Sequence, residues 1–461
     1  MTTLPSVDSP RSSPLGENRP TRAFLAPERG DGRALDTDLP AYDRFRAWFT
    51  RPLLTRPAFL DAEQTRGLDH DLPLLLRTLQ SLPDRLFDGD EAAFARALGW
   101  TGPGLAAALD MLSGPKVPLG RADLVFGPSG FRMVEFNTSS SLGSFEFGEL
   151  CRATLCDPSF REFALAESLE YHDPLELMSR TLLDTFGGRV EDRPTIALTH
   201  WVTSPVQVNA SLFVDLMTDL GFRMVTCTVK DLEYRGGHLY AHGVRVDAVY
   251  RTFLLKTVAQ EPDAADLLAP LHAAASEGAV GLFSPLNADL YGTKACMAML
   301  SDDRNRNRFT PEELDTIDRL LPWTRSLTDA DSVEHRDGSL LEHTLAAREN
   351  LVLKPSIGHA GQGIHAGWMT EPHAWPALVR NAVEQKHIVQ ERVPSLAERF
   401  HGSDRRDPPS TCHLHWGMFV TSAGLSGGFV KGLLGRDQDI RYLGDGSHVG
   451  CVFHVAPFAQ T

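Results

Sequence analysis

Four polar residues lie at a spacing that could bind a metal ion and a phosphate group. Arg121 and Asp123 begin one short apolar segment, and Glu135 and Asn137 end the next. The turn sequence at Gly127–Gly130 between the two segments predicts a β-hairpin. Residues two apart in a strand project from the same face, and hairpin pairing places Asp123 opposite the end of the second strand. The spacing therefore predicts a compact cluster of two carboxylates, an amide and a guanidinium.

The residue types in this cluster point to magnesium and phosphoryl chemistry. Carboxylate and amide oxygens suit Mg²⁺, which needs few protein ligands when phosphates supply the others. Arg121 is expected on the same face as Asp123, where it could meet a transferred phosphoryl group. The spacing alone leaves an alternative open, in which the acids pair with Arg121 and Arg132 at a polar hairpin end without a ligand.

A second candidate site is a glycine-rich loop that follows an apolar strand ending in Lys354. Gly358, Gly361 and Gly363 occupy this loop. Without Cβ atoms, backbone N–H groups can approach phosphate oxygens, and the lysine supplies a positive charge. A dinucleotide fingerprint requires a helix immediately afterwards, whereas residues 364–368 read as a strand. The alternative is a glycine-rich hairpin that binds nothing.

Lysine is scarce in this chain, so its positions are informative. Of 45 basic residues only seven are lysine, and arginine has taken over most of the exposed surface. A lysine retained in an apolar or glycine-rich segment suggests a compact charge for a phosphate, although chance retention remains open for any one of them. The seven are Lys116, Lys230, Lys256, Lys294, Lys354, Lys386 and Lys431.

Apolar periodicity indicates the elements that position these motifs. Residues 41–113 carry apolar side chains at three- and four-residue spacing, which predicts a helix-rich segment. After the hairpin, strands and a helix alternate as in an open α/β layer, and a second strand-rich region follows a helical stretch. The elements expected after the hairpin are strands at 195–199, 224–229 and 244–251, a helix at 207–220, helices within 263–321, and strands within 350–433.

In this order the motifs resemble the circularly permuted ATP-grasp ligases of the glutathionylspermidine synthase type. Arg-x-Asp followed by Glu-x-Asn looks like the metal-binding signature of that family. The resemblance implies that Asp123, Glu135 and Asn137 hold Mg²⁺ and that Arg121 stabilises the transition state of phosphoryl transfer. The chain departs just afterwards, where Ser139, Ser140 and Ser141 follow Thr138 in place of Asp-Thr-Pro. These serines become candidate substrate residues.

The same resemblance extends to the nucleotide site and covers residues 121–144 and 282–393. The glycine-rich loop is similar to the flexible loop that covers the phosphates, and Ile388–Val393 to the hinge strand where backbone amides read adenine and an acid reaches the ribose. Residues 287–300 resemble the helix whose lysine contacts the nucleotide. The implied ATP-binding residues are Lys294, Lys354, Ser356, Gly358, Gly361, Gln362, Gly363, Gln390, Glu391 and Val393.

Two cations are further substrate candidates. Arg251 ends the predicted strand 244–251 and could receive a substrate carboxylate, or it could pair structurally with Asp247. Lys431 follows the apolar run Gly428–Val430 and could face the phosphates or the carboxylate, or simply end a strand.

The sequence leaves the roles of several histidines undecided. His413 and His415 share a strand face and could ligate a metal, but packing is the better interpretation because no acid or cysteine joins them at ligand spacing. Asp445 and His448 lie in the glycine-rich stretch 444–450, where turn roles are favoured over ordering on a ligand.

Composition limits the class of protein. With 461 residues the chain is too long for one core. The formal charge of −15 without a basic cluster argues against nucleic acid as a partner, and no apolar stretch is long enough to span a membrane. The six scattered cysteines suggest free thiols and a cytoplasmic protein. Scarce lysine with abundant arginine, alanine and leucine fits a GC-rich bacterial genome.

The sequence therefore predicts an α/β protein with an ATP-grasp fold in circularly permuted order. The predicted function is an ATP- and Mg²⁺-dependent ligase that joins small-molecule carboxylate and amine substrates, on amino acids or small peptides of a natural-product pathway. The alternatives are a phosphotransferase on a small molecule and a non-catalytic nucleotide-binding protein. The expected segments are a disordered tail (1–38), a helical segment (39–120), a metal-binding hairpin with an α/β substrate domain (121–280) and an ATP-grasp nucleotide-binding domain (281–461).

Overall fold

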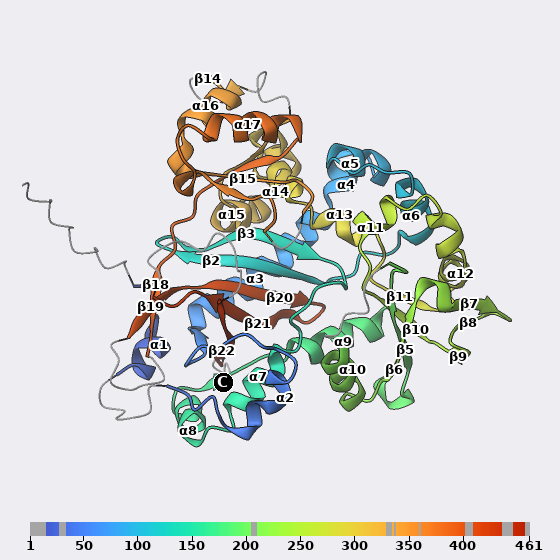
Figure 1. The fold of residues 1–461 in the computed structure, drawn as a ribbon, viewed down its shortest axis with the longest axis horizontal. Helices are drawn as coiled ribbons and strands as arrows, with labels where there is room; N and C mark the ends of the chain where they lie inside the picture. Colours follow the sequence, from blue (N-terminus) through green and yellow to red (C-terminus); the bar gives the residue numbers. More distant parts are fainter. Residues whose placement is uncertain are drawn as a thin grey trace, which may run out of the picture.

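Three larger sheets organise the chain (Figure 1). We call them the central sheet, which contains the predicted hairpin, the parallel sheet, and the upper sheet, which lies at the top of Figure 1. The computed structural model describes residues 15–26, 34–203, 210–328, 334–335, 338–358, 361–401, 409–435 and 446–456.

The central sheet joins segments that are far apart in the sequence. Its strand order is β1-β22-β21-β20-β2-β3, with β4 paired to β22 outside this path. It therefore combines strands from three of the four predicted segments. The strands are β1 (Ala58–Leu60), β2 (Gly120–Gly127), β3 (Gly130–Thr138), β4 (Leu169–Glu170), β20 (His415–Thr421), β21 (Gly424–Gly432) and β22 (His448–Val455).

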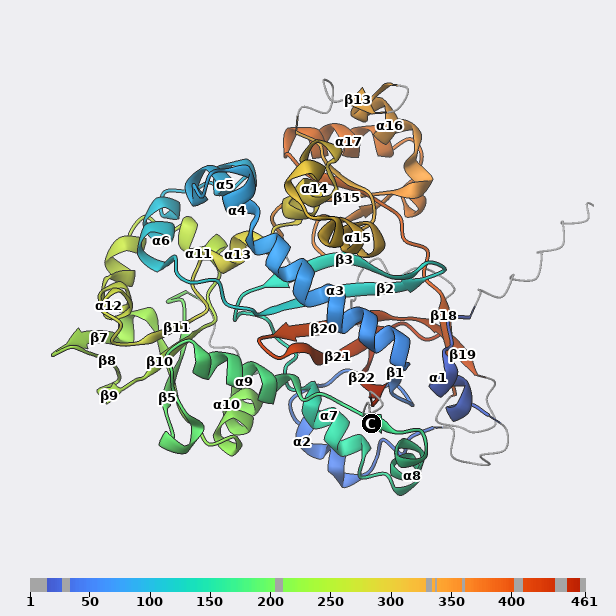
Figure 2. The same ribbon diagram turned by 180° about the vertical axis from the view of Figure 1, so that it is seen from behind.

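Helix α3 (Ala62–Gln80) covers one face of the central sheet, across which it runs in Figure 2. The helix begins with a capping box, in which Asp61 accepts hydrogen bonds from backbone amides and Gln64 bonds back to the Asp61 amide. Its buried leucines pack in one cluster with Ala122 and Leu124 of β2. Because successive strand residues face opposite sides, burying these two against α3 turns Arg121 and Asp123 to the other face.

Aromatic side chains close part of that other face. Phe145 stacks on Phe419 of β20 at 4.6 Å between ring centroids, and Phe147 of α7 (Phe147–Thr154) stacks on Phe429 of β21 at 4.7 Å. Helices α8 (Pro158–Ala166) and α9 (Pro174–Asp184) extend this packing through the same apolar cluster. The polar end of the hairpin lies beyond these aromatic pairs.

The parallel sheet confirms the predicted open α/β layer. Its strands all run parallel in the order β11-β10-β5-β6. The predicted strand 244–251 is divided, because β9 belongs to a small separate sheet and β10 to the parallel one. The elements are β5 (Thr195–His200), α10 (Ala210–Asp219), β6 (Arg223–Thr228), β7 (Leu232–Arg235), β8 (His238–Ala241), β9 (Val244–Arg245), β10 (Ala248–Arg251), α11 (Leu255–Ala259), α12 (Ala264–Ser276) and β11 (Gly281–Phe283).

The upper sheet is antiparallel and has its own small core. Its order is β12-β17-β15-β16, and Trp375 with Leu353 belongs to the apolar cluster beneath its helices. The elements of this region are α13 (Ala288–Tyr291), α14 (Lys294–Ser301), α15 (Pro311–Leu320), β12 (Thr324–Ser326), β13 (Glu334–His335), β14 (Gly338–Ser339), α16 (Leu340–Ala346), β15 (Leu351–Lys354), β16 (His365–Ala366), α17 (Trp375–Glu384) and β17 (Ile388–Glu391).

Shorter elements complete the described chain. The predicted helix-rich segment is present and includes a helix-rich run between β1 and β2. These elements are α1 (Arg19–Phe24), α2 (Asp43–Arg46), α4 (Leu82–Leu86), α5 (Glu91–Ala97), α6 (Leu105–Leu112), β18 (Ala397–Phe400) and β19 (Ser410–His413).

The predicted disordered tail is wrong for residues 15–26. Asn18 caps α1 and also donates to the Phe59 carbonyl at 2.6 Å. Phe24 is buried against the rings of Phe59, Phe160 and Phe163. One aromatic anchor in a stretch rich in proline and glycine is too weak a periodic signal for sequence reasoning to detect.

The prediction for the glycine-rich stretch 444–450 also needs correction. His448 is the first residue of β22, which pairs with β21 from Gly432 to Phe429. Asp445 lies outside the described residues.

The predicted free thiols are confirmed for all six cysteines. Among the residues described, none of the helices combines the length and the apolar character that crossing a membrane demands.

Removing the leucine at the centre of α3 should destabilise the sheet that it supports. Leu72 is 0% exposed and packs in the cluster with β2, β20 and β21. Leu72→Ala should therefore cost about 2–5 kcal/mol through lost burial and the cavity left behind. Thermal unfolding followed by circular dichroism measures the effect.

The matched control lies on the same helix. Arg66 is exposed, so Arg66→Ala should change the free energy of unfolding by less than about 0.5 kcal/mol. Equal melting temperatures for the two variants would contradict the assigned role of α3.

Candidate functional site

The predicted polar cluster forms at the β2–β3 hairpin. Arg121 pairs in register with Asn137, and Asp123 pairs with Glu135. The register shifts immediately after Asp123, where the strands carry a β-bulge. Cross-strand partners share a face of the sheet, so all four side chains project to the same side. The hairpin and its pairing are confirmed.

Each carboxylate in the cluster is paired with a cation. Arg121 Nε donates to Asp123 Oδ1 at 2.8 Å, and Lys294 Nζ, at the start of α14, donates to Glu135 Oε1 at 2.7 Å. Burial raises the pKa of Asp123, but the charges of Arg121 and Lys431 outweigh burial and hold that pKa below its ordinary value. The carboxylate is therefore ionised at neutral pH.

The alternative with Arg132 as a partner of the acids is wrong. Arg132 donates instead to the backbone carbonyls of Asp318, Arg319 and Leu321 at the end of α15. Lysine from a distant helix, rather than the nearest arginine in the sequence, compensates Glu135.

Lys354 connects the upper sheet to the central sheet. Its Nζ donates to the Val134 carbonyl of β3 at 2.8 Å and to Gln390 Oε1 at 2.6 Å. Gln390 is held in turn by Thr324, which accepts from its amide nitrogen at 3.1 Å. Burial lowers the pKa of Lys354 to about 8, although the charge of Glu135 opposes this effect. Lys354 is therefore a cation that loses its proton close to physiological pH.

A cavity of about 370 Å³ lies between the central and upper sheets, and we call it the intersheet cavity. One part of its wall is polar and contains the hairpin cluster with Lys354 and Lys431. The other part is apolar, which suits a flat ring whose charged extension reaches the cations. The apolar wall is formed by Val125, Val134, Val352, Ile364, Ala366, Trp368 and Val393.

The donor set of the hairpin fits Mg²⁺. Asp123, Glu135 and Asn137 offer hard oxygen atoms on one face of the hairpin, and these are the ligands that Mg²⁺ prefers. No group of three or more His, Cys, Asp or Glu residues suited to a metal is found within the described ranges.

Only some of the residues predicted in the glycine-rich loop and the hinge line the intersheet cavity. Gly361 lines the intersheet cavity, whereas Gln362 and Gly363 are exposed. His359 and Ala360 lie outside the described residues. Gly358 contributes its carbonyl, which accepts from Lys294 at 2.9 Å.

The prediction that the backbone amides of the hinge bind adenine is wrong for two of them. Glu391 N donates to the Trp323 carbonyl at 2.8 Å, and Arg392 N donates to the Asn350 carbonyl at 2.7 Å. Because both amides already donate to backbone carbonyls, they are not available to hydrogen-bond to a base. Gln390, Glu391 and Val393 do line the intersheet cavity.

Arg51 and Trp368 are among the residues of the cavity wall that sequence reasoning missed. Arg51 comes from the segment before β1 and donates to Ser447 Oγ at 2.6 Å, a long-range arrangement without a local signal. Trp368 follows β16, and the Arg392 guanidinium lies 4.3 Å from its ring centroid. The available signal was an aromatic residue at the end of the segment that follows the glycine-rich loop.

Lys431 and the two histidines face the intersheet cavity. Lys431 pairs in register with His415, and burial lowers its pKa. His413 Nδ1 lies 2.7 Å from Ser395 Oγ, and its Nε2 is buried without a hydrogen-bond partner in the described ranges. Nothing in the described structure groups the histidines into a metal site.

A second cavity of about 400 Å³, the side cavity, adjoins the first and shares Arg121 and Asn137 with it. Ser139, Ser141, Ser356 and Gly358 also line it. The predicted substrate and nucleotide residues are thus divided between two neighbouring cavities.

Two of the predicted substrate residues are buried behind the cavity wall and support it. Ser140 is 1% exposed, and its hydroxyl donates to the Arg251 carbonyl at 2.7 Å. Arg251 is 0% exposed and pairs with Asp289 at 2.8 Å, not with Asp247, which accepts from the Thr195 amide. Both lie behind the surface that a substrate could touch.

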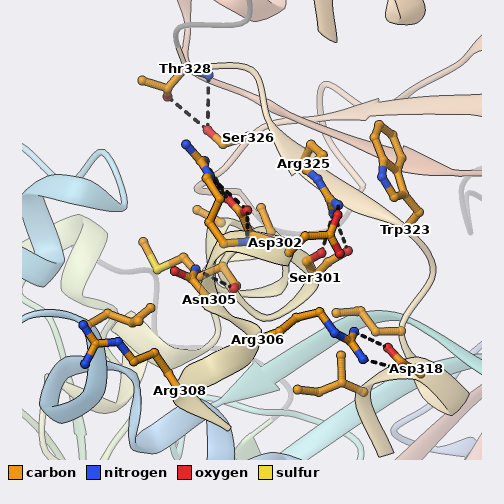
Figure 3. Close-up of a pocket in the computed structure, with 18 of the residues that line it drawn as sticks. Ser301, Asp302, Asn305, Arg306, Arg308, Asp318, Trp323, Arg325, Ser326 and Thr328 are labelled. Carbon is orange, nitrogen blue, oxygen red and sulfur yellow. Dashed lines mark hydrogen bonds and ion pairs between the residues drawn. The ribbon is translucent and has the colours of Figure 1, made fainter. Parts of the chain in front are cut away.

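A larger cavity, about 1260 Å³, is a polar groove beside the upper sheet (Figure 3). Its arginines bond mostly within the groove: Arg306 pairs with Asp318, and Arg325 with Asp303. Figure 3 shows Arg308 pointing away from these pairs. The groove shares Glu391 with the intersheet cavity but lacks its convergence of buried cations and carboxylates. We therefore place the functional site between the sheets.

The fold is mixed α/β, and it is similar to the fold of a solved structure. A glutathione synthetase-like effector from Globodera pallida, in its apo form, matches with a TM-score of 0.57 and 13% identity, covering 95% of this chain and 98% of that chain. A "Putative gamma-glutamylcysteine synthetase" from Methylobacillus flagellatus matches with a TM-score of 0.40 and 14% identity, covering 82% and 86%. At this identity the first likeness shows a shared fold alone. No protein-family model and no curated protein matches the sequence.

Loss of the Lys354 charge should weaken binding of a polyphosphate anion. The pKa of Lys354 is about 8, so raising the pH from 7 to 9 removes most of its charge. With ATP as a polyphosphate probe in calorimetry, the affinity should fall about tenfold over this range, provided that only the charged lysine binds.

Two variants separate this residue from its neighbours. Lys354→Met should bind weakly at both pH values and lose the pH dependence, whereas Lys431→Met should retain it. A wild-type affinity that does not change between pH 7 and 9 would refute the role of Lys354.

Proposed function

We propose that this chain is an ATP- and Mg²⁺-dependent ligase that joins a carboxylate to an amine through an acyl phosphate, on an ATP-grasp fold in circularly permuted order. One observation carries the proposal: two lysines contact the polar hairpin beside the cavity between the central and upper sheets, and Lys354 lines that cavity. Lys294 bonds to Glu135 and Lys354 to the Val134 carbonyl.

The order of the elements along the chain supports the permuted arrangement. The hairpin with Asp123, Glu135 and Asn137 precedes the upper sheet with Lys354, as in the family that the sequence resembles. The fold shared with a glutathione synthetase-like effector agrees with this assignment, and low identity leaves the substrates open.

The intersheet cavity offers a site for the nucleotide. The apolar wall around Val352 and Trp368 suits adenine, and Val393 N is the hinge amide left for it once those of Glu391 and Arg392 are occupied. The phosphates would extend toward Lys354 and Lys294, because compact cations suit phosphate oxygens. Ser356, Gly358 and Gly361 belong to the loop that would cover them.

Asp123, Glu135 and Asn137 would hold Mg²⁺, which supplies charge neutralisation at the phosphates. Arg121, whose guanidinium is fixed by Asp123, would offset the charge on the transferred phosphoryl group. In such reactions the protein contributes mainly position and electrostatics.

The reaction would have two steps. A carboxylate oxygen of the first substrate attacks the γ-phosphorus of ATP, and the bond from that phosphorus to the bridging oxygen breaks to release ADP. An amine nitrogen then attacks the acyl carbon of the acyl phosphate, the bond to the phosphate oxygen breaks, and the amine proton passes to solvent. The products are an amide, ADP and phosphate. The glycine-rich loop would exclude water from the acyl phosphate.

Neutralising Glu135 should abolish turnover without unfolding the chain. Glu135→Gln keeps the shape but removes the charge at the metal site, so ADP release should fall by about 10²-fold or more. The assay is coupled ADP detection with carboxylate and amine panels, and mass spectrometry of the product separates an amide from a phosphorylated compound.

The control for this variant is a glutamate of the same chain outside the site. Glu384 is exposed on α17, so Glu384→Gln should keep full activity. Unchanged turnover in Glu135→Gln would refute the metal assignment, and a phosphorylated product would favour the phosphotransferase.

Gly417 should matter for the position of Arg121. A Cβ atom at Gly417 would lie 2.6 Å from the Phe429 ring and 3.3 Å from Arg121 Cδ, so an alanine must displace these side chains. Misplacing the guanidinium should lower kcat about ten- to hundredfold in Gly417→Ala, with a small change in the KM for ATP.

Gly67 on α3 has open space around its Cβ position and serves as the control. Gly67→Ala should leave kcat unchanged. If both glycine variants turn over at the wild-type rate, the packing of Phe429 does not position Arg121.

A further inference from the structure

The side cavity has a group of hydrogen-bond donors at and beside the wall that it shares with the intersheet cavity. Asn137 Nδ2 is buried and has no hydrogen-bond partner in the described residues. Ser139 Oγ and Ser141 Oγ lie 2.7 Å apart and share one bond, which leaves one hydroxyl hydrogen for a ligand. Among the described residues, Arg121 Nη1 reaches only the Gly143 carbonyl, at 3.4 Å. These donors suit the oxygens of one carboxylate.

The backbone at Ser139 supports a functional role for this wall. Ser139 has a φ of 108°, a value that side-chain-bearing residues rarely adopt, although it is 2% exposed and tightly enclosed. Such conformations persist only where the surroundings impose them, and they are frequent at ligand sites. The strained turn brings its hydroxyl toward that of Ser141.

The acid in the wall of the side cavity is already compensated. Asp289 Oδ1 accepts from Arg251 Nη2 at 2.8 Å, and Oδ2 accepts from the Leu255 amide at 2.7 Å. Arg251 lies fully buried behind it. The other charged residue of the wall is Arg121, which is paired with Asp123. An ammonium group on a ligand would therefore meet no carboxylate free to receive it in the described wall.

The rest of the wall is largely apolar. Trp100, Leu142, Leu254 and Ile357 come from four different segments and line the side cavity. Trp100 Nε1 donates to Thr293 Oγ1 at 3.1 Å, so its indole N–H is already used and its ring remains for apolar contact. A volume of about 400 Å³ is in the range of small-molecule sites.

We propose that the side cavity binds the acyl donor and that this donor is a monocarboxylate with an uncharged, largely apolar body. The inference rests on the proposed ligase function and restricts the class of carboxylate that serves as its acyl donor. The carboxylate lies at Asn137 and the two serines, beside Arg121, where it meets the phosphates of the intersheet cavity. A zwitterionic amino acid or a dicarboxylate would bury a second charge without a partner, which is costly. An amino acid or small peptide remains suited to the role of the amine.

The test measures acyl phosphate formation without knowledge of the natural amine. Full-length protein, ATP and Mg²⁺ are incubated with hydroxylamine, which traps an acyl phosphate as a hydroxamate. The matched donors are 3-phenylpropanoate and phenylalanine, which differ by one ammonium group, and hexanoate and adipate, which differ by one carboxylate. We expect kcat/KM at least about tenfold higher for each monocarboxylate.

A variant in the cavity links this preference to the wall. Leu254→Glu introduces an acid into the side cavity, so the ratio of phenylalanine to 3-phenylpropanoate turnover should rise while the KM for ATP stays unchanged. Leu165→Glu is the control, because Leu165 is 77% exposed on α8 and should leave the ratio as in the wild type.

The outcomes separate this inference from the proposed function. Hydroxamate formation with equal or better rates from phenylalanine or adipate overturns the substrate class and leaves the ligase intact. An unchanged ratio in Leu254→Glu overturns the assignment of the donor to the side cavity. No hydroxamate from any carboxylate, together with no binding of ATP, refutes the proposed function itself.

Discussion

Compensation of buried charge at the β2–β3 hairpin is the constraint on which the rest of the structure depends. Asp123 finds its cation two residues away in Arg121, but Glu135 receives its cation from Lys294, 159 residues further along the chain. A buried carboxylate without a partner is costly, so this pair favours the approach of α14 and the region around it to the central sheet. Lys354 adds a second connection through the Val134 carbonyl. Lys354 thus both connects the two sheets and contributes a cation to the cavity between them.

The supporting layers make this compensation possible. Alternation in β2 places Ala122 and Leu124 against α3 and the charged residues on the opposite face, where stacked aromatic pairs cover the neighbouring surface. The parallel sheet acts in a similar way on the side cavity. Arg251, at the end of β10, fixes Asp289 and accepts a bond from Ser140 through its carbonyl, so a buried arginine shapes the wall without touching its surface.

Local patterns in the sequence predicted the hairpin, the α/β layer and the cluster at Arg121, Asp123, Glu135 and Asn137. These features depend on residues close together in the chain, and strand periodicity is enough to place them. The partners of the cluster were beyond this reasoning. Nothing near Glu135 indicates that Lys294 compensates it, and Arg132, the nearer cation, binds carbonyls instead. Helix α1 and the strand nature of His448 were missed because long-range packing, not periodicity, defines them.

Arg121 and Asn137 line both cavities, and this shared position constrains any chemistry of the site. A group bound in the intersheet cavity and a group bound in the side cavity can meet only where those walls join. The paired strands that carry the two residues hold them in register, so their spacing does not depend on a loop. The remaining walls come from separate segments, including Trp100 and Leu254, and can change without altering the shared wall. Changes in those walls can therefore alter which ligand the side cavity accepts. The hairpin still keeps Arg121 and Asn137 in place where the two cavities meet.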